Sequence, residues 1–204
     1  MIDDYPPRSD RLVEIEQMGR LFGTVVEGRA AVYLSAPITS GRNYMLWRQR
    51  CQVDESTPEY SRLMREGVIS PNRDRARRAA SRLRSEMQAT VIDPTALPDC
   101  KGWTQADYRI LWGRVIEHYA SKVVFLDDWE FSSGCVFEFR VANEVGVSCF
   151  DEQLRPLDLA TGLSLVREAI LEREQAMIPV TFLSAVERDL QRLLLSRECR
   201  HANP

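Results

Sequence analysis

The residues best suited to chemistry lie close together in the segment FLDDWEFSSGCVFEFRVANEVG, residues 125–146. Asp127 and Asp128 follow an apolar run typical of a buried strand, and Glu138 lies one turn inside the helix that a Ser-Ser-Gly turn predicts. A carboxylate beside a bound ligand can act as a nucleophile, a general base or, when protonated, a general acid. The spacing therefore indicates Glu138 as the candidate catalytic group, and we expect one of the two aspartates to be functional and the other structural.

The start of that helix is a candidate anion-binding site. The backbone N–H groups of Ser133, Gly134 and Cys135 have no partners within a helix, and the hydroxyls of Ser132 and Ser133 add further polar groups. Gly134 has no Cβ, so a ligand can approach its backbone closely. Because Gly134 and Glu138 are about one helical turn apart, we expect both to act on one ligand, with a phosphate or sugar hydroxyl at the helix start.

A second group of polar residues belongs to the apolar run AAVYLSAP, residues 30–37, and to the loop after it. Tyr33 lies within the run, and the loop offers hydroxyls, backbone amides and a guanidinium group that can hold a phosphate. The candidate binding residues here are Ser35, Ile38, Ser40, Gly41 and Arg42. Taken alone, this loop is a weak signal for a site.

The elements that must position these residues follow the order β-α-β-α-β-α-β. Apolar runs predict strands at 30–37, 89–92, 122–126 and 146–150, and helical periodicity predicts helices at 72–88, 104–121 and 132–145. This alternation predicts an α/β fold, Rossmann-like (flavodoxin-like), with a parallel sheet, helices on both faces and ligands at the carboxyl ends of the strands. In the helix 132–145 we expect Phe137, Val141 and Val145 to face the sheet, which directs Glu138 along the helix into that cleft.

The whole chain, 1–204, is predicted to form one domain with a core of about 30–150. An N-terminal helix is expected at 9–28. The C-terminal extension 157–200 should hold two helices, 160–177 and 180–200, broken at Pro179, that serve packing or oligomerisation. The segment 44–70 has an irregular pattern, typical of a lid or an insertion, and no element is assigned to it.

Composition excludes several functional classes. The net charge of −3 argues against a protein that coats nucleic acid, so nucleic acid is an unlikely partner. Five scattered cysteines without a C-x-x-C pair, and two distant histidines, predict neither a disulfide framework nor a metal site. The start MIDDYPPRSD lacks the pattern of an export signal, and no apolar run is long enough for a membrane span. We therefore expect a cytoplasmic protein without a membrane partner.

Two segments together resemble a known family. YLSAPITSGR is similar to the first strand and loop, and D-x-W-x-x-S-S-G-C-x-x-E-x-x-x-A to the catalytic helix, of the nucleoside 2-deoxyribosyltransferase superfamily, which includes nucleoside 5′-monophosphate N-glycosidases. The resemblance covers roughly 32–150, but the segment 44–70 has no counterpart in it. It implies an enzyme that cleaves the bond between a base and its sugar.

The resemblance also implies roles for individual residues. Glu138 would attack the anomeric carbon and form a glycosyl-enzyme that water or another base resolves. Tyr33 would orient Glu138, Asp127 or Asp128 would donate a hydrogen bond or proton to the departing base, and Asp107 would help to position sugar or base.

The implied substrate is a nucleoside monophosphate rather than a free nucleoside. The resemblance implies that Ser132, Ser133 and Gly134 hold the 5′-phosphate, with Trp129 of the same motif in the substrate-binding set, and that the loop 39–42 matches the arginine-bearing first loop of the nucleotide-hydrolysing members. No cofactor is implied. Members of the family are usually homo-oligomers, dimers or larger, in which a neighbouring subunit helps to close the site.

Three other functions stay open at this point. The same glutamate would serve a nucleoside deoxyribosyltransferase, with a second base as acceptor, or a glycohydrolase of NAD. A catalytically idle nucleotide-binding module, or a partner-binding protein working through the arginine-rich helix 73–84, is the alternative to an enzyme. For those arginines we favour the simpler interpretation of a solvated helix face paired with local acids.

Overall fold

The strands β1 (Ala31–Ser35) and β3 (Ala120–Phe125) lie side by side at the centre of a four-stranded sheet in which every neighbouring pair is parallel. β2 (Val91–Ile92) borders β1, and β4 (Ser148–Phe150) borders β3. The computed structural model describes residues 9–202, so most of the acidic, proline-bearing start used above lies outside the described residues. The predicted α/β class with a parallel sheet is confirmed.

The order β2-β1-β3-β4 reverses direction between the two central strands. The chain passes from β1 outward to β2, crosses back over β1 to β3, and continues to β4. In open parallel sheets the loops that leave the carboxyl ends of the strands at such a reversal diverge, and ligands bind in the gap between them. Here the diverging loops follow Ser35 and Phe125, which are the two regions that carry the candidate residues.

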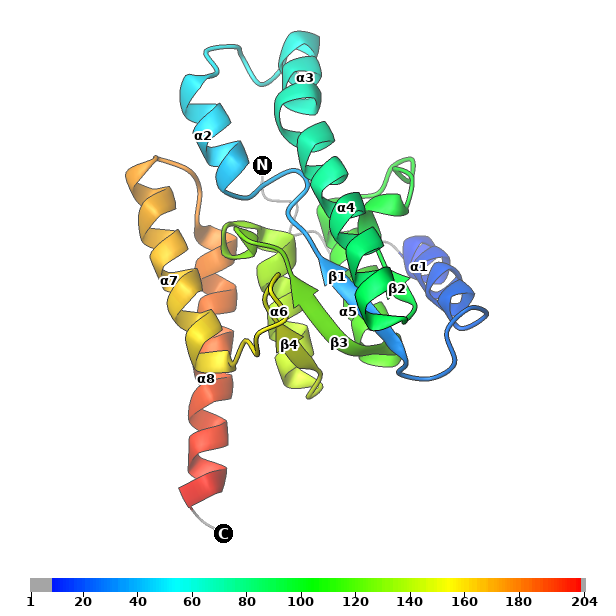
Figure 1. Ribbon diagram of the computed structural model, residues 1–204. Coiled ribbons are helices and arrows are strands. Elements are labelled where there is room, and N and C mark those ends of the chain that lie inside the picture. Colours follow the sequence, from blue (N-terminus) through cyan, green and yellow to red (C-terminus); the bar gives the residue numbers. More distant parts are fainter. Residues whose placement is uncertain (1–8, 203–204) are drawn as a thin grey trace.

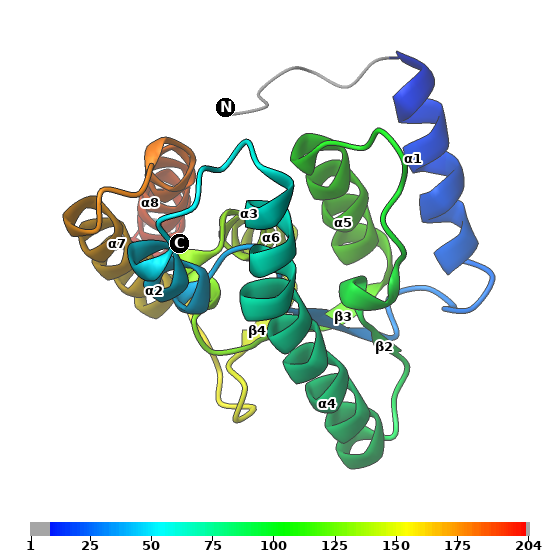
Figure 2. The same ribbon diagram turned by 90° about the horizontal axis from the view of Figure 1, so that it is seen from above.

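One face of the sheet is covered by α4 (Ser70–Met87), as Figures 1 and 2 show. Its alanine-rich stripe and Leu83 pack against Val32 and Leu34 of β1. Small side chains bring the helix close to the strands, and most of its arginines lie on the outer, exposed side. The amphipathic helix expected at 72–88 therefore forms, and it begins two residues earlier than expected, at Ser70.

The opposite face is covered by α5 (Gln105–Tyr119) and α6 (Ser133–Glu144), with α1 (Ser9–Phe22) packed on α5. Residues two apart on a strand point to the same side, so Tyr33 and Ser35 of β1 both face this layer. The sheet thus presents two hydroxyl-bearing side chains to the helix that carries the candidate glutamate.

Within α6 the residues that meet the sheet differ from those expected. Phe137 and Val141 pack against α5 at Gly113, so the expectation that they face the sheet is wrong. Phe139 takes that place, with its ring centroid 5.5 Å from that of Phe125 in β3. Because α6 is buried against the sheet, α5 and the C-terminal helices, a four-residue apolar spacing does not say which neighbour each residue meets.

The segment between β1 and α4 forms two helices, α2 (Arg42–Arg50) and α3 (Pro58–Met64), which stand beyond the carboxyl end of the sheet (Figure 1). The Thr57 hydroxyl caps α3 by accepting a hydrogen bond from the Tyr60 amide. α3 runs into a short π-helix, η1 (Arg65–Ile69), that continues as α4. This insertion is therefore joined directly to the helix that covers the sheet.

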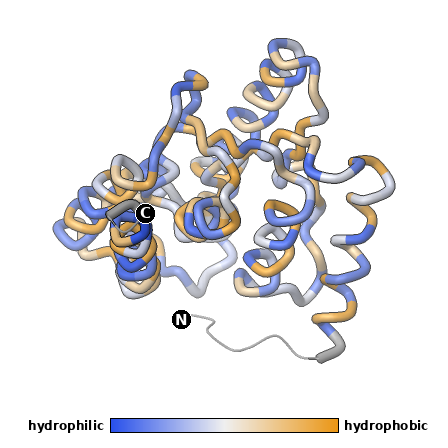
Figure 3. Tube along the Cα trace, turned by 90° about the horizontal axis from the view of Figure 1, so that it is seen from below, coloured by the Kyte–Doolittle hydropathy of each residue, from blue (hydrophilic) through white to orange (hydrophobic). Residues whose placement is uncertain are grey.

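The chain ends in two long helices, α7 (Leu159–Gln175) and α8 (Thr181–Ala202), separated at Pro179 as expected. A Cβ at Gly162 of α7 would lie 2.2 Å from the Phe139 ring, so a glycine lets α7 approach α6 closely. Figure 3 shows apolar and polar residues alternating around these helices, which have one buried side each. No helix within residues 9–202 is both long and apolar enough to span a membrane.

Candidate active site

Glu138 lies on α6 with only 8% of its surface exposed, and two hydroxyl groups of β1 donate hydrogen bonds to its carboxylate. The Tyr33 hydroxyl donates to Oε1 at 2.8 Å, and the Ser35 hydroxyl donates to Oε2 at 2.6 Å. Each carboxylate oxygen thus has its own donor, and both donors come from a strand in the middle of the sheet. This arrangement fixes the carboxylate in one orientation.

Burial raises the pKa of Glu138 to about 7, because the charged form loses its hydration. The hydrogen bonds from Ser35 and Tyr33 act in the opposite direction, since they stabilise the carboxylate. Burial also raises the pKa of Tyr33 well above its ordinary value, so its hydroxyl stays protonated and remains a donor. Near neutral pH, Glu138 is therefore divided between a nucleophilic carboxylate and a carboxylic acid.

The start of α6 is open to a ligand. Ser132 is its N-cap and accepts a hydrogen bond from the Cys135 amide, while the Ser40 hydroxyl donates to the Ser132 hydroxyl at 2.9 Å. The amides of Ser133 and Gly134 belong to the first helical turn, where N–H groups lack helical partners. A Cβ added to Gly134 would meet the Ser132 Oγ, 3.9 Å away, and nothing closer, so the space beside this glycine is unfilled by the protein.

A cavity of about 650 Å³ lies beside Glu138 and the start of α6. The loop after β1, the helix α5 and the short 3₁₀ helix η2 (Pro94–Ala96) form further walls, and α2, α3 and α8 each contribute a side chain. Tyr33 and Ser35 do not line this space but hold the carboxylate that does. The expected site residues that line the cavity are Ile38, Ser40, Ser132, Ser133, Gly134 and Glu138.

Arg42 and Gly41 do not line the cavity. The Arg42 guanidinium pairs with Glu172 of α7 at 2.7 Å and lies 4.7 Å above the Phe131 ring. Gly41 has a φ of 92°, in the left-handed region, and a Cβ there would lie 2.8 Å from Pro37, so this glycine shapes the turn before α2. The phosphate-binding role expected for this part of the loop has no support from its position.

Asp127 and Asp128 also lie outside the cavity lining. Arg75 of α4 approaches Asp127 at 3.4 Å and Asp128 at 3.9 Å, and it pairs with Glu152 at 2.6 Å. Burial raises the pKa of Asp128, while Arg75 and Arg42 act to lower it. The turn after β3 thus directs both aspartates toward α4 and its arginine.

Trp129 and Asp107 have clear structural contacts. Trp129 is buried with its ring centroid 4.9 Å from Phe125 and 4.7 Å from Phe139, within the core. The buried Asp107 carboxylate accepts a hydrogen bond from the Thr104 amide, and the Thr104 hydroxyl accepts one from the Asp107 amide, which together form a capping box at the start of α5. Neither residue lines the cavity, and substrate contacts for them stay predictions from the resemblance.

Several residues that line the cavity were not predicted from the sequence. Tyr108 and Trp112 belong to the helix expected at 104–121, where Asp107 was the site residue expected, yet both line the cavity beside Glu138. Their four-residue spacing places them on one helix face, but only the fold shows that this face borders a site. The other lining residues that were missed include Tyr44, Met64, Arg73, Asp99, Arg109 and Phe182.

Comparison with known proteins does not extend this description. The chain matches no family model, no curated protein and no solved structure. Within residues 9–202, no group of three or more His, Cys, Asp or Glu side chains is placed to hold a metal ion. What the site can do is therefore inferred from the buried Glu138 carboxylate, its two hydroxyl donors and the cavity beside them.

Proposed function

We propose that this protein is an N-glycosidase that hydrolyses the bond between base and sugar in a nucleoside 5′-monophosphate, as members of the nucleoside 2-deoxyribosyltransferase superfamily do. The observation that carries this proposal is the buried Glu138 carboxylate, held by Tyr33 and Ser35, on the wall of a cavity and one turn from an open helix start. The two segments that resemble the superfamily are far apart in sequence, yet they meet at this carboxylate.

The proposed reaction has two steps. A carboxylate oxygen of Glu138 attacks C1′ of the sugar, the C1′–N bond breaks, and its electron pair leaves with the base, which takes up a proton. Water then attacks C1′ of the glycosyl ester, the ester bond breaks, and the carboxylate is restored while the surplus proton passes to solvent. Each step inverts C1′, so the sugar phosphate is released with net retention.

Each side chain around the carboxylate has a role in this scheme. Tyr33 and Ser35 orient Glu138 and keep part of it ionised at neutral pH. The amides of Ser133 and Gly134 bind the 5′-phosphate, as the start of a helix does for anions. Ile38 and Ser40 line the space between, where the sugar would lie.

The proton donor for the departing base is the least constrained role. The resemblance assigns it to Asp127 or Asp128, but both are directed toward Arg75. Among the described residues, the carboxyl groups that line the cavity are those of Glu138 and Asp99. Asn variants of the three aspartates, assayed at one pH on a poor leaving base, identify the donor as the position whose loss slows base release most.

We further propose that the protein acts in the cytoplasm and as a homo-oligomer. All five cysteines are free thiols, which a reducing compartment favours. The C-terminal helices leave Leu171 and Leu195 more than half exposed, and Met177 between them 92% exposed. A second copy could cover these side chains, and light scattering on the purified protein measures the oligomeric state directly.

The function is tested by a chromatographic screen for free base released from each ribonucleoside and deoxyribonucleoside, each 5′-monophosphate, and NAD. The wild type should release base from one monophosphate, and Glu138→Gln should lose at least about a hundredfold in rate. Glu130→Gln is the matched control, because burial also raises the pKa of Glu130 to about 7 but its side chain does not line the cavity. Release from NAD or from free nucleosides alone would replace the proposed substrate, and no release in any condition would favour a binding module.

The phosphate position has its own test. Gly134→Ala adds a methyl group where the protein leaves space, in a helix that tolerates alanine, so the fold should be retained. The KM for the monophosphate should rise about tenfold, while any slow cleavage of the matching free nucleoside should be unchanged. Equal effects on both substrates would place the phosphate elsewhere.

A further inference from the structure

The insertion between β1 and α4 contributes directly to the cavity that holds Glu138. Tyr44 of α2 and Met64 at the end of α3 both line it. These are the helices that stand beyond the carboxyl end of the sheet in Figure 1. One wall of the cavity is therefore built from a part of the chain, 44–70, that has no counterpart in the family resemblance.

Aromatic side chains hold the insertion together as a unit. The Trp47 ring lies 6.2 Å from that of Tyr44 and 5.2 Å from that of Tyr60, which joins α2 to α3. Gly67 of the π-helix packs against the same tryptophan, since a Cβ there would lie 2.9 Å from its indole ring. Tyr44 is thus placed by packing within the insertion.

Two asparagines tie the insertion to the loop that borders Glu138. The Asn72 side chain donates to the backbone oxygen of Ile38 at 2.9 Å, and to that of Ser40 at 3.5 Å. Asn43 donates to the Asn72 side chain at 3.3 Å. Since Ser40 also binds Ser132, a continuous set of hydrogen bonds connects the insertion to the start of α6.

The chemistry of this wall fits one part of the proposed substrate. Tyr44 presents an aromatic ring and Met64 a thioether, and neither offers the positive charge with which an arginine or lysine binds a phosphate. Flat aromatic rings and polarisable sulfur pack well against the face of a nucleobase. Phe182 of α8 and Trp112 of α5 line the same cavity and extend this apolar surface.

From this placement we infer that Tyr44 and Met64 form a roof over the base and set which bases the site accepts. The inference rests on the proposed function and adds a specificity-determining role for the insertion. The phosphate is held at the start of α6 and the base beneath the roof, with Glu138 lining the same cavity. One chain therefore supplies both ends of the binding site.

The test separates binding of the base from binding of the sugar phosphate. Isothermal titration with each free nucleobase, and separately with ribose 5-phosphate, is carried out on the wild type, Tyr44→Ala, Tyr44→Phe and Met64→Ala. Tyr44→Ala and Met64→Ala should weaken binding of the preferred base about tenfold or more, whereas Tyr44→Phe, which keeps the ring, should stay within about threefold. Binding of ribose 5-phosphate should stay within about twofold in all three variants.

Control variants distinguish the loss of a contact with the base from a general disruption of the insertion. Leu46→Ala lies on the same helix but is 43% exposed and does not line the cavity, so base binding should match the wild type. Normal base binding by Tyr44→Ala and Met64→Ala, or equal losses for base and ribose 5-phosphate, would overturn the roof while leaving the proposed function intact. A wild type that binds no free base would likewise overturn the roof, whereas the proposed function stands or falls with the base-release screen.

Discussion

Glu138 and the two aspartates of the turn after β3 lie in different surroundings, and they differ in their partners. Glu138 is buried and accepts hydrogen bonds from two neutral hydroxyls, without a cation among the causes that shift its pKa. Asp127 and Asp128 instead belong to an arginine–acid cluster, formed by Arg42 and Arg75 with Asp127, Asp128, Glu152 and Glu172. No cation neutralises the charge of the Glu138 carboxylate, so it can attack a bound ligand. The carboxylates paired with arginine instead connect parts of the fold.

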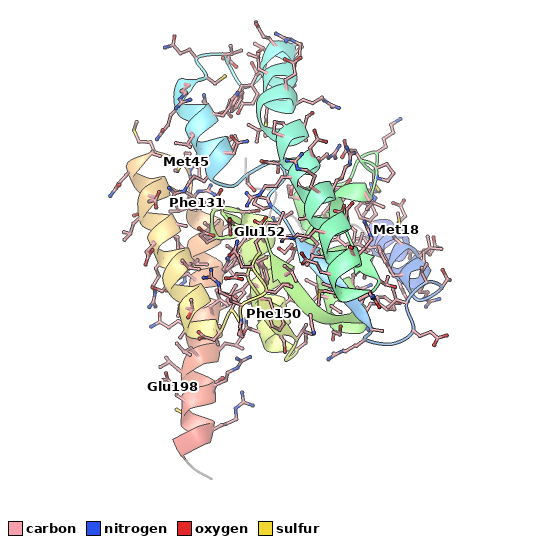
Figure 4. All side chains as sticks on the ribbon, in the orientation of Figure 1. Met18, Met45, Phe131, Phe150, Glu152 and Glu198 are labelled. Atoms are coloured by element: carbon pink, nitrogen blue, oxygen red, sulfur yellow. The ribbon has the colours of Figure 1, made fainter. Side chains whose placement is uncertain are left out.

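The cluster connects parts of the chain that are distant in sequence. Arg75 reaches from α4 to the turn after β3 and to Glu152, which Figure 4 labels in the loop after β4. Arg42 reaches from α2 to α7 and lies over Phe131, also labelled there. Because these pairs are only partly buried, each stabilises the fold modestly, but together they keep the loops around the site in place.

The largest effect is expected on the rate of base release, which should depend strongly on Glu138 and weakly on Asp128. Glu138→Gln should reduce base release at least about a hundredfold, because the amide cannot attack C1′. Asp128→Asn should stay within about fivefold, since its carboxylate faces Arg42 at 3.6 Å and Arg75 at 3.9 Å, and asparagine tolerates the left-handed φ of 69° found there. Steady-state rates at saturating substrate measure both. A hundredfold loss in Asp128→Asn would show that this aspartate turns into the cavity and acts as the proton donor.

The burial of Glu138 should also make the stability of the protein depend on pH. A buried carboxyl whose pKa rises from 4.5 to about 7 binds a proton more tightly in the folded state, so the free energy of unfolding should fall as pH rises between those values. The shift corresponds to about 3 kcal/mol at most. Glu138→Gln has no charge to bury and should lose this slope, becoming as stable as the wild type or more so above pH 7. Urea unfolding of both proteins at pH 5 and pH 8 measures the difference, and parallel pH curves would contradict the assigned pKa.

Local sequence patterns were sufficient for much of the fold. The strands around Tyr33 and Val123 and the helices α4, α5 and α6 form near their predicted positions, because apolar periodicity and turn residues act over a few residues. The position of Glu138 followed from its distance to the helix start. Its contact with Tyr33 was expected from the resemblance. Its contact with Ser35 arises because Tyr33 and Ser35 are two residues apart on β1 and therefore point to the same side of the sheet.

The remainder of the site depended on contacts that no local pattern encodes. The orientation of Asp127 and Asp128 follows from Arg75, which lies some fifty residues earlier in the chain. Tyr44 lines the cavity only because the insertion folds over the carboxyl end of the sheet, and the one local signal there was the Thr57-Pro58 start of α3. Apart from the contact between Tyr33 and Glu138 that the resemblance implied, side chains that meet across long sequence separations were therefore the ones missed.

Either of the two hydroxyls that hold Glu138 can be removed by a single substitution. Tyr33→Phe deletes a hydrogen bond that stabilises the carboxylate, so the pKa of Glu138 should rise further. The acid limb of the kcat/KM profile should move to higher pH, with a loss of several-fold at pH 6 and a smaller loss at pH 9. Ser35→Ala should shift the profile in the same direction. Tyr119→Phe, on α5 and outside the cavity lining, is the control, and a uniform loss at all pH values in Tyr33→Phe would mean that the hydroxyl acts on geometry alone.

The smallest effect is expected in the arginine–acid cluster itself. Arg75→Met removes the cation shared by Asp127, Asp128 and Glu152 while keeping an unbranched side chain, and it should lower the free energy of unfolding by about 1 kcal/mol. The deficit should shrink in high salt, because screening weakens the pairs in the wild type. Arg78 on the same helix makes no ion pair with the described residues, so Arg78→Met should leave the free energy of unfolding unchanged. Base release should stay within about twofold, since a cluster that serves structure can be weakened without touching the buried carboxylate; a loss comparable to that of Glu138→Gln would mean that the two regions work as one site.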